Sequence, residues 1–484
     1  MSDNIVRTRF APSPTGYMHI GNLRTALYSY LLAKANGGKF IVRIEDTDRE
    51  RLVDGAVDVI LKTLKDTGLT YDEGPVVGGD FGPYIQSERK DIYKKYAQEL
   101  VDKGYAYYCF CTKERLDSLH KEGEIGAGYD RHCRDLSKEE IEKNLAEGKP
   151  YVIRQKMPLE GVTGYDDAIF GHIETENSEL QDQILMKADG FPTYNFCHIV
   201  DDHLMGVTHV VRGSEYLTST PKYVLLYDAF GWERPVYCHL PLIMGKNEDG
   251  SVSKLSKRHG AVSFQDLLKD GYLPEAIVNY LAFLGWCPKD STEEFFTLDE
   301  LTKIFDLEGI SKAPAVFDYE KLAWYNSHYI KELPLDKFME MAKPYYSEEL
   351  KAYADDERLA AMVQTRISAF PEVNEKASFA AGLPEFDNQL YVNKKNKTTG
   401  EMAEKVLAEV IPVLENCGQW DNDTLFETLK EFASKLELKA GAVMWIVRIA
   451  VSGMAVTPGG ATELMTVLGK EESLSRLKTS LSRL

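Results

Sequence analysis

The sequence predicts an α/β fold built on a doubly wound parallel (Rossmann-type) sheet, and the order of its first elements is the main reason. Short β-type runs alternate with helical patterns over the first hundred residues, in the order strand, helix, strand, helix. Parallel strands need helical crossovers between them, so this order is typical of a parallel sheet covered by helices. The pattern breaks near residue 109, and helical periodicity dominates after about residue 260. We therefore expect an inserted α+β segment and a helical C-terminal region.

The first half of the sheet is expected to contain two strands, at residues 5–11 and 40–44. Between them, residues 22–35 carry apolar side chains at helical spacing, and Gly37-Gly38 end that helix. Residues 54–65 repeat the helical spacing and predict a second helix, with its apolar side chains on one face.

The sheet is expected to resume after the inserted segment. Residues 193–201, 207–212 and 237–244 are rich in β-type side chains and predict three further strands. Residues 245–253 are rich in polar residues and glycine, and predict a loop.

Length, composition and charge exclude several classes of protein. The 484 residues, 44% of them hydrophobic, suffice for roughly three domains of ~150 residues with buried cores. A net charge of −19 argues against coating nucleic acid or membranes by bulk charge, but leaves a local basic groove open. Seven cysteines suit a reducing cytoplasm better than a disulfide scaffold. With no signal peptide or membrane-spanning run found, we expect a cytoplasmic protein with no membrane partner.

The most informative segment runs Arg9-Phe-Ala-Pro-Ser-Pro-Thr-Gly-Tyr-Met-His19-Ile-Gly-Asn22. It has the pattern of a strand that ends in a proline-stiffened loop and leads into a helix. The free N–H groups of a helix N-terminus bind anions, and His19 can add a hydrogen bond to a phosphate oxygen. The alternative is a proline–glycine turn with a polar capping residue.

A second segment carries three cations on the polar loop, Lys254, Lys257 and Arg258. Mobile cations can close over a triphosphate and stabilise the charge that develops as pyrophosphate leaves. The alternative is three solvated side chains. The phosphate-binding hypothesis depends on the two segments occurring together in one α/β core.

A third candidate site is a zinc site in the inserted segment. Cys109, Cys111 and Cys133 can supply three thiolates to a tetrahedral zinc ion. The fourth ligand is left open among Asp135, Tyr129, His132 and His120. The alternative is three unmetallated thiols.

The two phosphate-binding segments resemble the signature motifs of class I aminoacyl-tRNA synthetases, His19-Ile-Gly-Asn22 and Lys254-Leu-Ser-Lys-Arg258. The glutamyl branch is indicated by Asn22, where the general class has a second histidine. Four further sequence motifs resemble those of the bacterial glutamyl-tRNA synthetases: residues 9–16, Arg43-Ile-Glu-Asp-Thr-Asp48, Pro192-Thr-Tyr-Asn195 and Val200-Asp-Asp-His-Leu-Met-Gly206.

The resemblance implies five segments. A Rossmann-type catalytic domain occupies residues 1–108 and 191–259 and is interrupted by an acceptor-end-binding domain at 109–190. A stem-contact domain follows at 260–328, and a helical anticodon-binding domain at 329–484.

The resemblance also implies the reaction and its partners. L-Glutamate is activated by ATP, with Mg²⁺, to glutamyl-adenylate, and the glutamyl group passes to the 3′ end of tRNA(Glu). One structural Zn²⁺ is implied for the inserted domain, where Asp135 stands in place of the histidine of some members. The chain is expected to act as a monomer.

The residues implied by the resemblance fall into four groups. The catalytic residues are His19, Lys254 and Lys257. The ATP-binding residues are Pro12, Thr15, Gly16, His19, Gly21, Asn22, Ser256 and Lys257. The glutamate-binding residues are Arg9, Ala11, Ser13, Glu45, Tyr194, His198 and Arg212. Arg366 is matched to an anticodon-contacting arginine, with an ordinary exposed helical arginine as the alternative.

Three rival functions share parts of this pattern. Glutaminyl-tRNA synthetases share the core motifs but carry β-barrel anticodon domains, whereas residues 330–484 show helical spacing. A truncated paralogue that glutamylates a modified tRNA base lacks an anticodon-binding region. A small-molecule adenylyltransferase of the same nucleotide-binding fold has no use for the long helical region.

Overall fold

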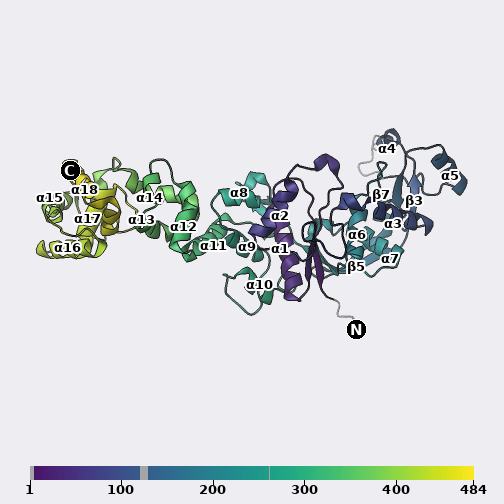
Figure 1. The fold of residues 1–484 in the computed structure, drawn as a ribbon, viewed down its shortest axis with the longest axis horizontal. Helices are drawn as coiled ribbons and strands as arrows, with labels where there is room; N and C mark the ends of the chain where they lie inside the picture. Colours follow the sequence, from purple (N-terminus) through teal and green to yellow (C-terminus); the bar gives the residue numbers. More distant parts are fainter. Residues whose placement is uncertain (1–4, 120–128, 261) are drawn as a thin grey trace. The chain divides into compact units, whose positions relative to one another are not determined.

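The computed structural model describes residues 5–119, 129–260 and 262–484. The chain forms two compact units. Met1–Leu267 and Ile277–Asp318 make up the first, called here the α/β unit, and Leu268–Ala276 and Tyr319–Leu484 make up the second, called the helical unit. Figure 1 shows the strands of the first unit and the all-helical character of the second.

The sheet of the α/β unit begins with two parallel strands, β1 (Arg7–Phe10) and β2 (Lys39–Val42), joined by helix α1 (Ile20–Ala35). On the other side of β1 lies β8 (His209–Gly213), where the Thr208 amide donates to the Arg7 carbonyl at 2.9 Å. Strand β9 (Val236–Leu240) runs parallel to β8. This strand–helix–strand arrangement is the predicted Rossmann-type core.

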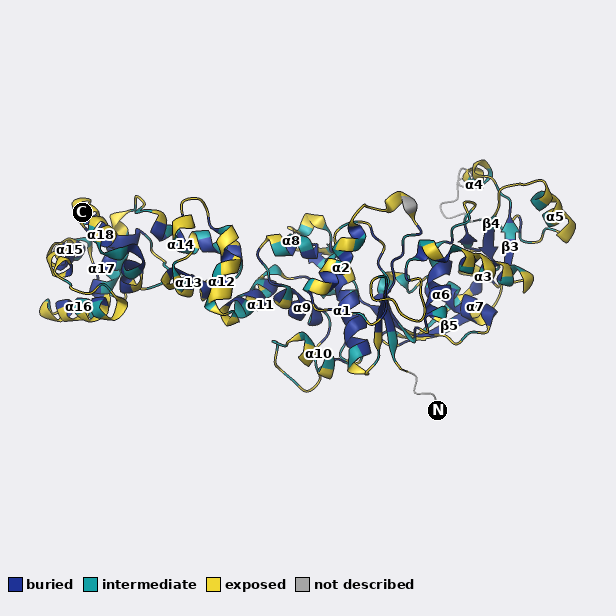
Figure 2. Ribbon diagram, in the orientation of Figure 1, coloured by how far each residue is buried: buried dark blue, intermediate teal, exposed yellow. Residues whose placement is uncertain are grey.

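β8 and β9 belong to a four-stranded sheet next to the β1–β2 pair, and two more strands complete it. β5 (Val162–Asp167) pairs in parallel with β9, and β6 (Gly171–Glu176) pairs antiparallel with β5. α1 is buried along most of its length (Figure 2), which explains why apolar side chains surround it. α2 (Ala56–Asp66) instead has a single apolar face.

The strand predicted at residues 193–201 is wrong, because this segment forms helix α6 (Tyr194–Leu204). Most of α6 is buried against α3 (Lys90–Asp102) and α7 (Thr220–Phe230). The buried part of α6 includes the polar residues His198, Asp201 and Asp202, so polar side chains in this segment do not mark a solvent-exposed helix face. Packing of this segment against other helices, and not its local β-type sequence pattern, determines that it is helical.

The inserted segment is α+β, as predicted. An antiparallel sheet contains β3 (Ala106–Cys109), β4 (Val152–Gln155) and β7 (Ile184–Met186). The segment also forms two short helices, α4 (Lys113–Leu119) and α5 (Lys138–Ala146). Figure 2 shows α5 exposed to solvent.

The predicted strand at residues 237–244 is divided in two by Pro241, which cannot donate to a strand ladder. Its second part is β10 (Ile243–Lys246), and the predicted loop that follows is a hairpin with β11 (Val252–Lys254). β10 also pairs in parallel with β12 (Ala315–Val316). Three more helices occur in this part of the chain: α8 (Phe264–Lys269), α9 (Pro274–Ala282) and α10 (Leu298–Ile304).

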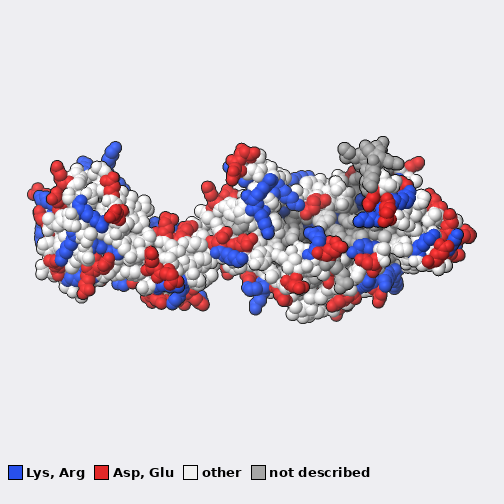
Figure 3. All heavy atoms as spheres, turned by 90° about the horizontal axis from the view of Figure 1, so that it is seen from above, with Lys and Arg blue, Asp and Glu red and all other residues white. Residues whose placement is uncertain are grey.

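The helical unit has a core in which α17, the most apolar of its helices, packs on α18. Its helices are α11 (Tyr319–Glu332), α12 (Leu335–Ala342), α13 (Glu357–Gln364), α14 (Val373–Ala381), α15 (Gly400–Glu415), α16 (Asn422–Lys435), α17 (Ala440–Ser452) and α18 (Ala461–Ser482). Among the described residues, no helix is both long and apolar enough to cross a membrane. Figure 3 shows Lys and Arg interspersed with Asp and Glu, so the net negative charge is not one continuous acidic surface on the face drawn.

Candidate active site

A cavity of about 610 Å³ opens at the carboxyl ends of β1 and β8 and at the N-terminus of α1. This is where ligands bind in open α/β sheets. Most of the predicted ATP, glutamate and catalytic residues line it: Arg9, Ala11, Pro12, Ser13, Thr15, His19, Gly21, Asn22, Glu45, Tyr194, Arg212 and Lys254. Four predicted residues are not part of its lining, namely Gly16, His198, Ser256 and Lys257.

His19 is the N-cap residue of α1. Its Nδ1 accepts a hydrogen bond from the Gly21 amide at 3.0 Å. Burial, and then the positive charge of Lys254, lower the pKa of His19, so the ring is neutral at pH 7. A neutral ring that accepts at Nδ1 carries its proton on Nε2. His19 therefore offers one N–H donor at the positive N-terminal end of α1, where the Ile20 and Gly21 amides already have acceptors within the protein.

The two signature segments meet in the fold although more than two hundred residues separate them. The Ile20 amide donates to the Val262 carbonyl at 2.9 Å, and the Phe264 amide donates to the Met18 carbonyl at 3.0 Å. The chain just after Lys257 is thereby tied to the start of α1. Lys254, at the end of β11, lines the same cavity as His19.

The second signature segment is organised by His259, which sequence reasoning missed. A short 3-10 turn at Lys257–His259 follows β11, and His259 Nδ1 accepts from the Ser256 amide at 3.0 Å. The imidazole lies over Gly245 in β10, where an added Cβ would be 2.5 Å from the ring. Gly245 and His259 thus hold the Lys254–Lys257 loop against the hairpin.

Arg9 lies in a buried network of charges. Its Nε is 3.1 Å from Asp202 Oδ1, and Arg43 donates to both Asp202 at 2.8 Å and Glu45 at 3.0 Å. Burial acts to raise the pKa of Asp202, but Arg9 and Arg43 outweigh it and hold that pKa well below its ordinary value. Arg9 therefore already has a carboxylate partner within the protein.

The pKa of Glu45, in the same network, is shifted in the opposite direction from that of Asp202. Burial raises its pKa to about 7, although Arg43 opposes the shift. The carboxyl group lines the cavity and is close to the point of half-protonation at neutral pH. A cation that enters the cavity can therefore bind the carboxylate form and displace its proton.

Within the described part of the chain Arg212 forms no ion pair with a carboxylate, in contrast to Arg9. Its Nε donates to His239 Nε2 at 3.0 Å, and its Nη2 donates to Thr220 Oγ1 at 2.7 Å. Its Nη1 is buried without a hydrogen-bond partner among the described residues. The guanidinium carbon lies 5.0 Å from the ring centres of both Tyr216 and Tyr223. A buried cation with an unused donor on a cavity wall is a site for an anionic ligand group.

His198 lies behind the cavity wall. Its ring stacks on Tyr194 with 4.7 Å between centres. Burial lowers the pKa of His198 to about 3, and neither ring nitrogen is hydrogen-bonded within the described part of the chain. Its position supports packing against Tyr194.

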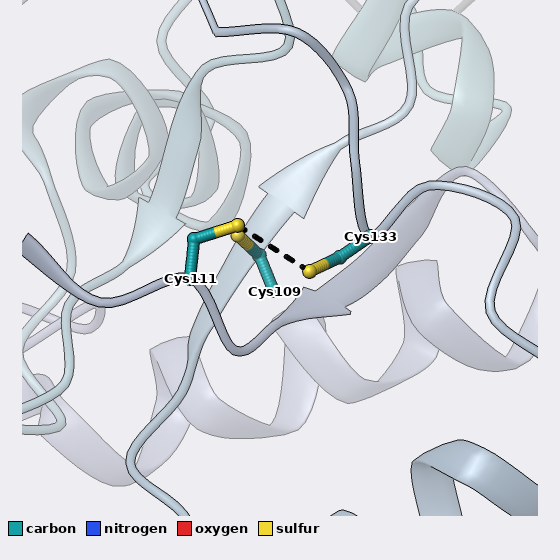
Figure 4. Close-up of side chains that lie close together, drawn as sticks. All are labelled: Cys109, Cys111 and Cys133. Carbon is teal, nitrogen blue, oxygen red and sulfur yellow. Dashed lines mark hydrogen bonds between the residues drawn. The ribbon is translucent and has the colours of Figure 1, made fainter. Parts of the chain in front are cut away.

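The three cysteines predicted to bind zinc come together (Figure 4). The Sγ atoms of Cys109, Cys111 and Cys133 all lie within 4.8 Å of one another. Tyr129 Oη lies 3.2 Å from Cys109 Sγ and 3.9 Å from Cys111 Sγ. Three thiols and a phenol within this distance can supply four ligands to one zinc ion.

Asp135, the candidate for the fourth zinc ligand that stands at the histidine position of some family members, is not brought into this cluster. Its side chain is 84% exposed, and its carboxylate lies 3.5 Å from Lys156 Nζ. His132 is exposed and also lies outside the cluster. His120 lies outside the described residues.

Arg366 follows α13 in the helical unit and is exposed. Its Nε donates to the Pro458 carbonyl at 3.3 Å. This contact fits an ordinary surface arginine as well as an RNA-binding one.

Two family models match the chain. Residues 5–324 match the catalytic domain of the class I tRNA synthetases (E and Q), and residues 337–481 match an anticodon-binding domain. The glutamate–tRNA ligase of Clostridium botulinum strain Hall is 55% identical over 484 residues, with 99% of each chain covered. That of Clostridium novyi is 56% identical over 489 residues, with 100% of this chain and 99% of the relative covered.

A solved structure agrees with these relatives. The crystal structure of a glutamate tRNA ligase from Elizabethkingia meningosepticum, in complex with its amino acid, superposes with a TM-score of 0.87 at 35% identity. The match covers 99% of this chain and 100% of that one. A cavity that joins the two signature segments, a Rossmann-type sheet and these matches lead to one conclusion: the chain belongs to the class I tRNA synthetases of the glutamate and glutamine group.

Proposed function

We infer that this chain is a glutamate–tRNA ligase, which activates L-glutamate with ATP and transfers it to tRNA(Glu). The observation that carries the choice of amino acid is Arg212, a buried guanidinium in the cavity wall with an unused Nη1 donor and no carboxylate partner in the described residues. The relatives and the solved structure named above support the same choice.

The ATP triphosphate is proposed to bind at the N-terminus of α1. The positive end of the α1 dipole and the Nε2 donor of His19 suit phosphate oxygens. Lys254, on the cavity wall, is proposed to stabilise the charge that develops on the phosphates, with Lys257 from the adjoining 3-10 turn. Mg²⁺ accompanies ATP in such sites, mostly through phosphate oxygens and water.

The amino acid is proposed to bind between Arg212 and Glu45. Arg212 suits the side-chain carboxylate, because its unused Nη1 can donate a charge-assisted hydrogen bond to it. Glu45 suits the ammonium group. Arg9, paired with Asp202, is proposed to act mainly by holding the wall of the cavity.

The chemistry requires positioning and charge stabilisation, and no covalent enzyme intermediate. An oxygen of the glutamate α-carboxylate attacks the α-phosphorus of ATP, and the bond to the β-phosphate oxygen breaks, releasing pyrophosphate. A terminal ribose hydroxyl of the tRNA then attacks the activated carbonyl carbon, and AMP leaves.

We also propose that different segments of the chain bind different parts of the tRNA. Residues 1–108 and 191–259 carry the reaction, 109–190 receive the acceptor end, 260–328 contact the stem, and 329–484 bind the anticodon arm, with Arg366 among the contacts. The match of residues 337–481 to an anticodon-binding domain supports the last assignment.

A structural zinc ion is proposed for the inserted segment, held by Cys109, Cys111 and Cys133 with Tyr129 Oη as the fourth ligand. The sulfur cluster and the nearby phenol support this set, and the exposure of Asp135 disfavours it as a ligand. Bound zinc would hold β3 to the loop that carries Cys133.

The function is tested by measuring charging of purified tRNA(Glu) with labelled glutamate or labelled glutamine, in the presence of ATP and Mg²⁺. We expect glutamate to be charged at least a hundredfold more efficiently than glutamine, because an amide cannot satisfy Arg212 as a carboxylate does. Preferential charging with glutamine would overturn the proposal.

A further inference from the structure

We propose that Asp167 and His239 form a buried relay that fixes the orientation of Arg212 and thereby maintains the preference for glutamate over glutamine. This inference rests on the proposed function, because it assigns positioning residues to the same amino-acid pocket. It adds two residues from outside the signature segments.

The three side chains form a line across three neighbouring strands. Asp167 ends β5, His239 lies in β9, and Arg212 lies in β8 directly opposite His239 in the strand register. Asp167 Oδ2 is 2.6 Å from His239 Nδ1, and His239 Nε2 is 3.0 Å from Arg212 Nε. The Asp167 and His239 side chains are completely buried.

The hydrogen bonds determine which nitrogen of His239 carries the proton. Asp167 also accepts from the amides of Ile169 at 2.9 Å, Phe170 at 2.8 Å and His239 at 3.1 Å. Burial acts to raise the pKa of Asp167, but the hydrogen bond from the His239 side chain and those from the Phe170 and Ile169 amides outweigh it, so the carboxyl group is ionised and can only accept. His239 must then donate from Nδ1.

A neutral His239 that donates from Nδ1 has a lone pair on Nε2. Burial and the Arg212 charge lower the pKa of His239, which keeps the ring neutral. The lone pair accepts the Nε–H of Arg212, and Thr220 accepts from Nη2. With two of its nitrogens held, the guanidinium keeps Nη1 as its uncommitted donor for the ligand.

The sharpest test is Asp167→Asn. In this variant the asparagine NH₂ group takes the position of Oδ2 and donates a hydrogen bond to His239 Nδ1. Because Nδ1 then accepts, the imidazole proton moves to Nε2. There it faces the Nε–H of Arg212, so two donors oppose each other. We expect the KM for glutamate in aminoacylation to rise by about 10- to 100-fold, as for the loss of one or two charge-assisted hydrogen bonds. The KM for ATP should change less than threefold, and selectivity against glutamine should fall.

Two variants of His239 separate the relay from simple packing. His239→Gln retains an oxygen acceptor for Arg212 and should stay close to the wild-type KM for glutamate, whereas His239→Leu removes the acceptor and should resemble Asp167→Asn. A glutamine side chain has no ring tautomer to invert, so the double variant Asp167→Asn/His239→Gln should be less impaired than Asp167→Asn alone.

Thr163→Val is the matched control, because Thr163 is a buried residue of the same strand, β5, and its hydroxyl bonds to Asn177, remote from Arg212. It should lower the melting temperature without raising the KM for glutamate. A folded Asp167→Asn with wild-type glutamate KM and selectivity would overturn the relay, as would equal rises in the glutamate and ATP KM values.

If Asp167→Asn does not fold, the ring nitrogens of His239 are observed by ¹⁵N NMR in the wild-type chain. A proton on Nδ1 supports the relay, and a proton on Nε2 overturns it. Failure of the wild-type chain to charge glutamate would instead contradict the proposed function, so the two failures are distinguishable.

Discussion

His19 Nδ1 accepts the amide proton of Gly21 at 3.0 Å, and this bond leaves Nε2 as the donor at the start of α1. We predict that His19→Asn lowers kcat for aminoacylation by about 100-fold, because the shorter asparagine amide, held at the cap by its oxygen, places its N–H donor away from the position of Nε2 beside the transition-state phosphates. Asparagine is itself a good N-cap, so the melting temperature should change little. Steady-state kinetics and thermal unfolding of the same preparation test this, and an unchanged kcat would contradict the role of His19.

Lys254 and Lys257 are predicted to act together on the phosphates. Lys254→Ala and Lys257→Ala should each lower kcat by at least tenfold, because each removes a positive charge near the leaving pyrophosphate. Lys246→Ala is the matched control, since Lys246 is exposed and ends the strand paired with β11. A loss in the control equal to that in the two variants would show a general effect of charge on tRNA binding instead.

The catalytic core was more predictable from the sequence than the contacts that hold it. His19 and Glu45 belong to short sequence motifs, and Arg212 was assigned through the family resemblance; the structure brings all three to one cavity. Asp167 and His239 are proposed to act through Arg212 from two other strands. Their contact with Arg212 depends on the register between β8 and β9, which the spacing of residues in the sequence does not reveal.

The two errors in secondary structure have the same origin. α6 buries polar residues, among them Asp201 and Asp202, so its sequence does not show the exposed polar face by which a surface helix is identified. The hairpin of β10 and β11 is polar because it is largely exposed, so its sequence resembles that of a loop. The only local sign of its close packing is Gly245, which lies under the His259 ring. In both cases tertiary contacts, which local patterns do not contain, decide the conformation.

Glu45 should make glutamate binding dependent on pH near neutrality. The pKa of its carboxyl group is raised to about 7, and only the ionised form attracts the ammonium group of the substrate. The KM for glutamate should therefore rise as the pH falls from 8 to 6, by up to about tenfold per unit once the pH is below 7. Glu45→Gln should raise the KM at pH 8 and abolish this dependence. An unchanged slope in that variant would assign the pH effect to another group.

The zinc proposal predicts about one equivalent of zinc per chain, lost on Cys109→Ser. Cys417→Ser is the matched control, because Cys417 is a partly exposed cysteine remote in sequence from the cluster and not part of it. Tyr129→Phe should reduce zinc affinity while leaving the three thiols intact. Elemental analysis of the purified variants decides the matter, and wild-type chain that contains no zinc when purified from zinc-supplied cells would rule out the site.

Arg9 and Arg212 should respond differently to substitution, because Arg9 is ion-paired with Asp202 and Arg212 forms no ion pair with any carboxylate that the structure describes. Arg9→Gln leaves Asp202 with one fewer cation in a buried network and should cost about 3 kcal/mol of unfolding free energy, since breaking a buried ion pair exposes an uncompensated charge. Arg212→Gln removes a cation that lacks such a partner, so its cost in stability should be smaller. Its effect should fall on the substrate: the kcat/KM for glutamate should drop by at least 100-fold, and the ratio of glutamate to glutamine charging should fall with it. Chemical denaturation and charging assays on both variants test this contrast. A glutamate-specific loss of kcat/KM in Arg9→Gln with no such loss in Arg212→Gln would show that Arg9, and not Arg212, binds the substrate carboxylate.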